Sequence, residues 1–180
     1  MTRARLNTLI ALAFALVAGT AATIVRQHET TLAHGEMVLL ELAPVDPRSL
    51  MQGDYMALRF EIDRHLPAPL EHSADPNTPR AAPPRYAFLA LDPERRATLA
   101  GTGNGATPPA GQVAVRIRAR DHLNSVGPNA FFFREGSGAD YESARWGEFR
   151  VAPGGDALLT HLRDARLARV GTTKPFDDID

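Results

Sequence analysis

The amino-terminal part of the chain carries an almost unbroken run of apolar and small residues. This run extends from Leu6 to Val25, follows Arg3 and Arg5, and ends before Arg26. About 20 helical residues, each rising about 1.5 Å, span the roughly 30 Å hydrocarbon core of a bilayer. The pattern therefore predicts a transmembrane anchor helix, and the basic residues before it favour an amino terminus inside the cell and a following domain outside.

A cleavable signal peptide is the alternative interpretation of the same run. Small residues that suit a cleavage site gather toward its end, at Ala18, Thr20, Ala21 and Ala22. The run is long for the apolar part of a signal peptide, and this length favours a retained anchor. We expect its helix to continue through residues 27–33, beyond the membrane.

Farther along the chain, apolar residues recur at every second position in short segments bounded by turn residues, which is typical of half-buried strands. In the clearest segment the residues on the buried face are expected to be Met56, Leu58, Phe60 and Ile62. The expected strands are Glu36–Ala43, Met56–Asp63, Tyr86–Leu91, Arg96–Ala100, Gln112–Arg120, Asn129–Arg134, Gly147–Ala152 and Ala157–Arg163, with an edge strand in Ala165–Val170 and a short helix at Ala139–Trp146. We predict a mostly β fold of about eight short antiparallel strands and one short helix, with an N-terminal transmembrane α-helix.

These elements divide the chain into three parts. Residues 1–33 form a cytoplasmic stub, the anchor helix and a short extension, residues 34–171 form the mostly β extracytoplasmic domain, and residues 172–180 form an acidic flexible tail. Between strands, the proline-rich stretch from His65 to Pro84 and the glycine-rich stretch Gly101–Gly111 are expected to be loops, because proline cannot continue a sheet and glycine favours turns.

Composition excludes several kinds of chemistry. The 180 residues include no cysteine, which excludes disulfides, thiolate metal sites and cysteine nucleophiles. A net charge of −1, without a basic run, gives no case for a nucleic-acid partner. Arginine supplies the positive charge almost alone, since Lys174 is the single lysine.

Three arginines, Arg116, Arg118 and Arg120, occupy the polar face of one expected strand, whose inward positions are Val113, Val115, Ile117 and Ala119. One interpretation is that they pair with Glu61 and Asp63 on a neighbouring strand, which contributes about 0–1 kcal/mol for each exposed pair. The alternative is that they bind an anion or acidic lipid headgroups.

A turn and the strand after it carry the most distinctive motif. Asp46-Pro47 suits the start of a turn, and Gly53-Asp54-Tyr55-x-x-Leu58-x-Phe60 follows it. This motif resembles the signature of the GDYXXLXY family of bacterial membrane-anchored proteins, with Phe60 where the family name has tyrosine. The stretch Phe132-Phe133-Arg134-Glu135-Gly136 with Glu142 is also similar. The resemblance implies a place in a bacterial membrane and no assigned activity, and members resemble partners of multi-spanning membrane proteins.

Two groups of residues form the candidate binding surface. The motif group is Asp46, Arg48, Gly53, Asp54, Tyr55, Leu58 and Phe60, and the second, polar-aromatic group is Arg134, Glu135, Tyr141, Glu142 and Trp146. Asp54 either caps backbone amides of the turn or orients an arginine of a partner. We expect Tyr55 and Phe60 to point to opposite faces of the strand, and the two groups to form one surface if the fold brings them together.

Catalytic and metal-binding interpretations have weaker support. Ser49-Leu50-Met51-Gln52-Gly53-Asp54 resembles the serine region of a membrane-tethered, signal-peptidase-like hydrolase, but that mechanism needs a desolvated lysine base and Lys174 lies in the polar tail. The six histidines form no close ligand pair, and His65 and His72, with Glu71 and Asp75, are better explained as solvated loop residues than as a metal site. We expect no cofactor and no metal.

The sequence therefore favours a non-enzymatic accessory protein. We expect a single-pass protein of the bacterial cytoplasmic (inner) membrane, with its carboxyl-terminal domain on the periplasmic side. Its expected partners are a multi-spanning integral membrane protein and, through the helix, the lipid bilayer. A membrane-tethered hydrolase and a periplasmic module that binds lipids or small ligands are the alternatives.

Overall fold

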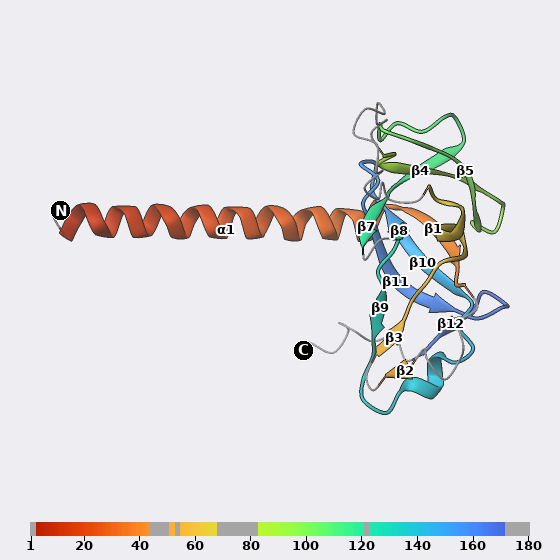
Figure 1. Ribbon diagram of the computed structural model, residues 1–180. Coiled ribbons are helices and arrows are strands. Elements are labelled where there is room, and N and C mark those ends of the chain that lie inside the picture. Colours follow the sequence, from red (N-terminus) through yellow and green to blue (C-terminus); the bar gives the residue numbers. More distant parts are fainter. Residues whose placement is uncertain (1–2, 44–50, 53–54, 68–82, 121–122, 172–180) are drawn as a thin grey trace, which may run out of the picture.

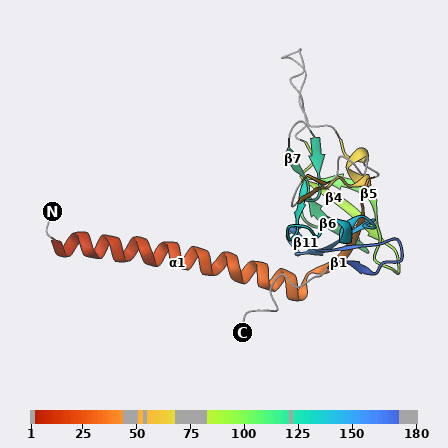
Figure 2. The same ribbon diagram turned by 90° about the horizontal axis from the view of Figure 1, so that it is seen from below.

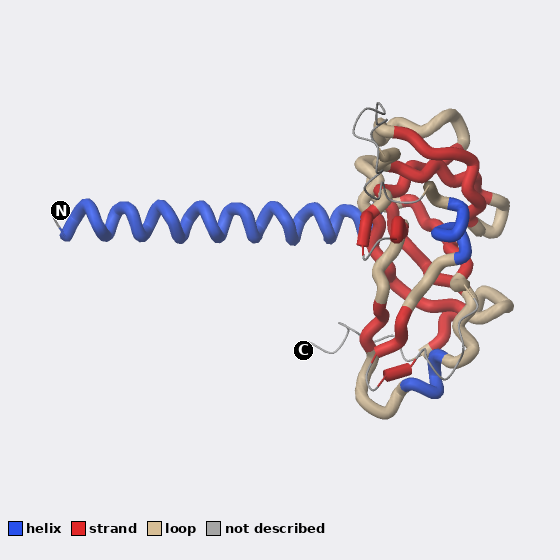
Figure 3. Tube along the Cα trace, in the orientation of Figure 1, coloured by secondary structure: helices blue, strands red, loops and turns tan. Residues whose placement is uncertain are grey.

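A computed structural model of the chain describes residues 3–43, 51–52, 55–67, 83–120 and 123–171. One long helix, α1 (Arg3–His34), projects from a domain built mainly of short strands (Figures 1 and 2). The strands are β1 (Glu36–Glu41), β2 (Met51–Gln52), β3 (Tyr55–Ala57), β4 (Tyr86–Leu91), β5 (Ala97–Gly103), β6 (Gln112–Arg116), β7 (Arg118–Arg120), β8 (Leu123–Ser125), β9 (Ala130–Phe132), β10 (Trp146–Val151), β11 (Ala157–Arg163) and β12 (Arg169–Val170). Two single turns of 3₁₀ helix, η1 (Glu61–His65) and η2 (Gly138–Tyr141), complete the described elements (Figure 3). The predicted fold class is confirmed.

Helix α1 presents its apolar side chains outward along most of its length. Phe14 exposes 75% of its surface, and the segment Asn7–His34 is long and apolar enough to cross a membrane. The hydroxyls of Thr20 and Thr23 donate to carbonyls one turn back, at distances of 2.8 Å from Val17 O and Gly19 O. Polar groups that are satisfied within their own helix suit an apolar surrounding. The expected continuation of the helix beyond Val25 is confirmed.

The strands form antiparallel sheets whose orders are β1-β10-β11-β12, β5-β4-β6, β2-β3-β9 and β7-β8. Isolated bridges join them, from Leu39 to Arg96 and from Leu42 to Phe60. The expectation that Tyr86–Leu91 is a central strand is confirmed, because β4 lies between β5 and β6. The β10–β11 hairpin and its turn also match their predicted positions closely.

The core lies where the inner faces of these sheets meet. Phe60 and Phe149 are fully buried at its centre, with their ring centroids 5.4 Å apart and the rings at 67°. Such an edge-to-face contact is a favoured aromatic geometry. The other buried members of the core are Val38, Leu40, Met56, Leu58, Ile62, Leu66, Ala87, Leu89, Val115, Val126, Tyr141, Val151, Leu162 and Val170.

The expected strand Met56–Asp63 is wrong in its extent. Strand β3 ends at Ala57, and Glu61–His65 form the 3₁₀ turn η1. The carboxylate of Asp63 accepts hydrogen bonds from the Ser125 hydroxyl (2.7 Å) and the Val126 amide (3.1 Å), which holds this part of the chain in a turn against β8. The predicted buried set is nevertheless right, because Met56, Leu58, Phe60 and Ile62 are all buried.

Two further expectations are corrected. The expected helix Ala139–Trp146 is only the single turn η2, because Trp146 pairs with Glu41 at the start of β10. The expected strand Gln112–Arg120 breaks at Ile117, whose amide donates to the carbonyl of Arg85 (2.8 Å), and Ala119 is exposed instead of inward.

The arginines of this broken strand do not pair as expected. Arg116 and Arg118 lie 3.1 Å and 4.0 Å from Oδ1 of Asp156, instead of facing Glu61 and Asp63. The side chain of Arg120, most of the proline-rich loop and the carboxyl-terminal tail lie outside the described residues.

Helix α1 is fixed to the domain at Gly35. Its amide donates to the carbonyl of Thr31 (2.8 Å), and its carbonyl accepts from Nη1 of Arg150 (3.2 Å). A Cβ at this position would overlap the Thr31 carbonyl and lie 3.1 Å from the Val151 amide nitrogen. The close approach of the helix end to β10 therefore requires glycine.

We predict that Gly127→Ala destabilises the domain by about 1–3 kcal/mol, the usual cost of overpacking a filled core. A Cβ at residue 127 would overlap the ring of Phe60 and lie 3.1 Å from Cζ of Phe149. The matched control is Gly154→Ala, which has nothing within 4 Å of the added Cβ. Urea unfolding of the full chain in mild detergent, followed by the fluorescence of the single tryptophan, Trp146, measures both. Equal stability of the two variants would contradict the tight fit around Phe60.

Candidate functional site

Strands β3 and β9 bring the motif tyrosine beside the phenylalanine-rich segment. Tyr55 pairs with Phe132 and Met56 with Phe131 in an antiparallel ladder. The ring centroids of Tyr55 and Phe132 lie 5.8 Å apart. Tyr55 is half-buried, whereas Phe132 exposes 75% of its surface. We call these two side chains the aromatic surface.

Tyr141 of η2 supports the segment that carries the aromatic surface. Its ring stacks on Phe133 with the centroids 5.2 Å apart, and lies 5.3 Å from Phe131. Burial raises the pKa of the Tyr141 hydroxyl, and the negative charge of Asp140 raises it further, so the hydroxyl stays protonated at neutral pH. Tyr141 therefore acts as a core residue, and the rings on either side of Phe132 are held in place.

The motif residues divide into three groups. Asp46, Arg48, Gly53 and Asp54 lie outside the described residues. Leu58 and Phe60 are 5% and 1% exposed and belong to the core, so they can bind no partner at the surface. Tyr55 is the described motif residue that reaches the surface, on the face of the chain opposite to Met56.

The second candidate group is separated by the fold. Arg134 and Glu135 follow the aromatic surface in a turn closed by a 3.0 Å bond from the Ser137 amide to the Arg134 carbonyl, and they are exposed, as is Glu142. These three residues flank η2 along the chain. Trp146 belongs elsewhere, because it begins β10 and its ring lies 6.0 Å from the guanidinium of Arg96.

A buried carboxylate, which sequence reasoning missed, lies on the outer face of the β10 sheet. Glu148 is 1% exposed, and its Oε2 accepts from Nε of Arg163 at 2.7 Å. Arg169 donates to both oxygens, from Nη2 to Oε1 at 3.0 Å and from Nε to Oε2 at 3.2 Å. His161 approaches Oε1 to 3.8 Å, which is too far for a hydrogen bond. The ion pairs of this carboxylate with Arg163 and Arg169 thus join β10, β11 and β12.

The environment of Glu148 keeps it ionised. Burial raises its pKa, but hydrogen bonds and positive charge from Arg169 and Arg163 outweigh this effect and leave the pKa below its ordinary value of 4.5. Burial lowers the pKa of His161, and the charge of Arg169 lowers it further, so this ring is neutral at neutral pH. Glu148 is ionised and has no proton to donate, and His161 makes no hydrogen bond to it. The cluster therefore suits a structural role better than proton transfer.

The sequence offers little signal for this cluster. Glu148 occupies a polar position of an alternating strand, which normally predicts exposure to solvent. It is buried because two arginines, 15 and 21 residues farther along the chain, fold over it. Many sequences have a carboxylate on one strand and two arginines on the next hairpin. This pattern is therefore too common to identify a buried carboxylate that two arginines cover.

The structure describes only some of the residues that were considered for a hydrolase or a metal site. Ser49, His72 and Lys174 lie outside the described residues. Within the described parts of the chain, no group of three or more His, Asp or Glu side chains is arranged to hold a metal ion.

Comparison with known proteins gives one match. The family described as GDYXXLXY protein matches the chain over residues 17–162. No curated protein and no solved structure matches. The match includes part of α1, the motif and strands β1 to β10, together with most of β11.

We predict that Glu148→Gln lowers the free energy of unfolding by about 2–3 kcal/mol at neutral pH, because it leaves Arg163 and Arg169 without their counter-ion. A carboxylate whose pKa is lower in the folded state stabilises the fold above its unfolded pKa, and this contribution is lost as the pH falls through the folded value. The difference between wild type and variant should therefore shrink as the pH falls below about 4.5. Urea unfolding as a function of pH, with the exposed Glu135→Gln as control, measures it. A difference that is constant with pH would rule out the ionised clamp.

Proposed function

The chain belongs to the GDYXXLXY family, and from this premise we propose that it is a membrane-anchored accessory subunit whose β domain docks on a multi-spanning protein of the same membrane. In this proposal α1 anchors the chain in a bacterial cytoplasmic membrane. The domain stands on the periplasmic side, since Arg3 and Arg5 before the apolar run favour an amino terminus on the cytoplasmic side.

The observation that carries the docking proposal is the exposure of Phe132. A large aromatic ring that is 75% exposed beside a second ring is unfavourable in water and typical of a contact residue. Among the other described residues of the domain, Leu123 of β8 is the remaining large apolar side chain with comparable exposure. The aromatic surface is therefore a local feature of the β3–β9 edge.

The position of this surface supports a partner in the same bilayer. Figure 1 shows β9 and β7 on the side of the domain from which α1 leaves. A partner embedded beside α1 would rise from the membrane on that side. Strand β9 is also the last strand of the described sheet β2-β3-β9, which is the position at which a strand of a partner would add to that sheet.

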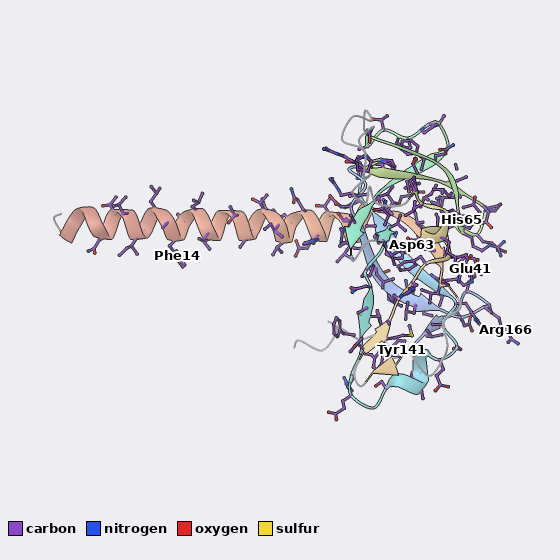
Figure 4. The ribbon with its side chains drawn as sticks, in the orientation of Figure 1. Phe14, Glu41, Asp63, His65, Tyr141 and Arg166 are labelled. Atoms are coloured by element: carbon purple, nitrogen blue, oxygen red, sulfur yellow. The ribbon has the colours of Figure 1, made fainter. Side chains whose placement is uncertain are left out.

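We predict that a photoreactive phenylalanine analogue at position 132 crosslinks, in cells that carry the native operon, to one discrete membrane protein. The control position is Arg166, which is exposed on the side of the domain away from α1 (Figure 4). A discrete product from position 132 that is absent from position 166 supports the proposal. Equal products from both positions, or none from position 132, would contradict it.

The same surface can be tested by a substitution that leaves the fold intact. We expect Phe132→Ser to change the free energy of unfolding by less than about 0.5 kcal/mol, as is usual for exposed positions. It should abolish co-purification of the crosslinked partner in mild detergent. Leu123→Ser is the matched control, because it also removes an exposed apolar side chain but lies on β8. If both variants keep the partner, or both lose it, Phe132 is not the specific contact.

A further inference from the structure

An open cleft of about 720 Å³ lies in the angle between the last three turns of α1 and the domain. The helix contributes Thr23, Arg26, Thr30 and His34 to its walls, and the domain contributes Arg118 and Asp156. The β10–β11 turn contributes Pro153 to the lining. A hydrogen bond from Arg150 of β10 to the Gly35 carbonyl joins the end of the helix to the domain beside the cleft.

The cleft is positively charged. Arg26 and Arg118 face it from opposite walls, and of the described residues that line it, Asp156 alone carries a carboxylate. That carboxylate is shared, since it lies 3.1 Å from Nε of Arg116 and 4.0 Å from Nη2 of Arg118. Asp156 thus neutralises one of these two arginines, and the cleft keeps an excess of positive charge to which an anion can bind.

The position of the cleft along the helix matches the headgroup layer of a membrane. Arg26 is the first charged residue after the apolar run that ends at Val25. From Arg26 to His34 the helix rises by about 12 Å at roughly 1.5 Å per residue. The polar headgroup layer of one leaflet is about 5–8 Å thick. The cleft therefore begins at the edge of the hydrocarbon core and spans the depth at which lipid phosphates lie.

We propose that this cleft binds the phosphate of an anionic phospholipid from the membrane that holds α1, with Arg26 and Arg118 on opposite sides of the headgroup. The inference rests on the membrane anchoring in the proposed function but not on the docking of a protein partner. Arginine is suited to this role because its planar guanidinium binds phosphate with two parallel hydrogen bonds. In this proposal Arg118, on the polar face of β7, binds the headgroup in addition to its ion pair with Asp156.

The test is native mass spectrometry of the full chain in mild detergent, titrated with phosphatidylglycerol or with phosphatidylcholine. We expect wild type to prefer phosphatidylglycerol. Arg26→Gln and Arg118→Gln should each reduce this preference about fivefold, which corresponds to about 1 kcal/mol for one arginine at a membrane surface. Arg166→Gln, which removes an exposed arginine far from α1, should leave the preference unchanged (Figure 4).

Three outcomes would overturn the inference. The first is equal binding of both lipids by wild type, and the second is a loss of binding in Arg166→Gln as large as in the cleft variants. The third is complete displacement of the lipid by an excess of inorganic phosphate, which would indicate a site for free phosphate. Flotation of the same protein with vesicles separates the two proposals. If the protein floats with phosphatidylcholine vesicles but shows no lipid preference, only the cleft inference fails, and if it does not float, the anchoring fails as well.

Discussion

The edge-to-face contact between Phe60 and Phe149 is the interaction on which the domain depends. Phe60 follows β3 of the β2-β3-β9 sheet, and Phe149 lies in the middle of β10 in the β1-β10-β11-β12 sheet, so their contact joins these two sheets. Gly127 and Gly147 leave room for the rings, since a Cβ at either position would crowd them. Two phenylalanines of this size bury a large apolar area and fix the distance between the sheets. The second half of the family motif is therefore a packing element, whereas Tyr55 lies half-buried on β3.

The buried Glu148 represents a second kind of constraint, at the opposite face of the same sheet. Three of the four strands in that sheet contribute to its ion cluster, and β12 contains only two residues, Arg169 and Val170. So short a strand has few hydrogen bonds to its neighbour in the sheet. The bonds from Arg169 to Glu148 provide additional attachment of β12 to the sheet. The apolar side of β12 is held in parallel by Val170, which belongs to the core. Charge on one face and packing on the other thus keep the sheet edge in place.

The sequence predicts those features of the fold that depend on neighbours along the chain. Tyr86–Leu91 and Ala157–Arg163 have the predicted bounds, because each is a continuous apolar or alternating run between clear turns. The extent of Met56–Asp63 is not predictable in this way, since the 3₁₀ turn depends on a hydrogen bond that Asp63 accepts from the hydroxyl of Ser125, 62 residues away. The alternation nevertheless predicts the correct buried residues, because Phe60 and Ile62 are buried in the observed structure as they would be in the expected strand.

The candidate site is likewise predictable from the sequence only in part. The motif points to Tyr55, and the phenylalanine run is recognised by its similarity to the family, but only the β3–β9 register shows that Phe132 lies beside Tyr55. Closeness in sequence groups Trp146 with Arg134, but the fold places Trp146 at the start of β10, apart from the turn that holds Arg134. Arg26 and Arg118 are 92 positions apart in the numbering and share a cleft only because Gly35 fixes the angle of α1. Residues that act together across such distances carry no common sequence pattern.

A membrane anchor changes how strong these contacts need to be. A tethered domain meets a partner in the same bilayer at a high effective concentration, so that a small contact surface can be sufficient. Two rings at the β3–β9 edge would be a weak interface for two soluble proteins, which usually bury about 1,200–2,000 Å² in total. In the proposed function, the helix supplies the proximity and the aromatic surface supplies the specificity. A headgroup held between Arg26 and Arg118 would add orientation, because it restricts rotation of the domain about the helix axis and so determines which face Phe132 presents to the partner.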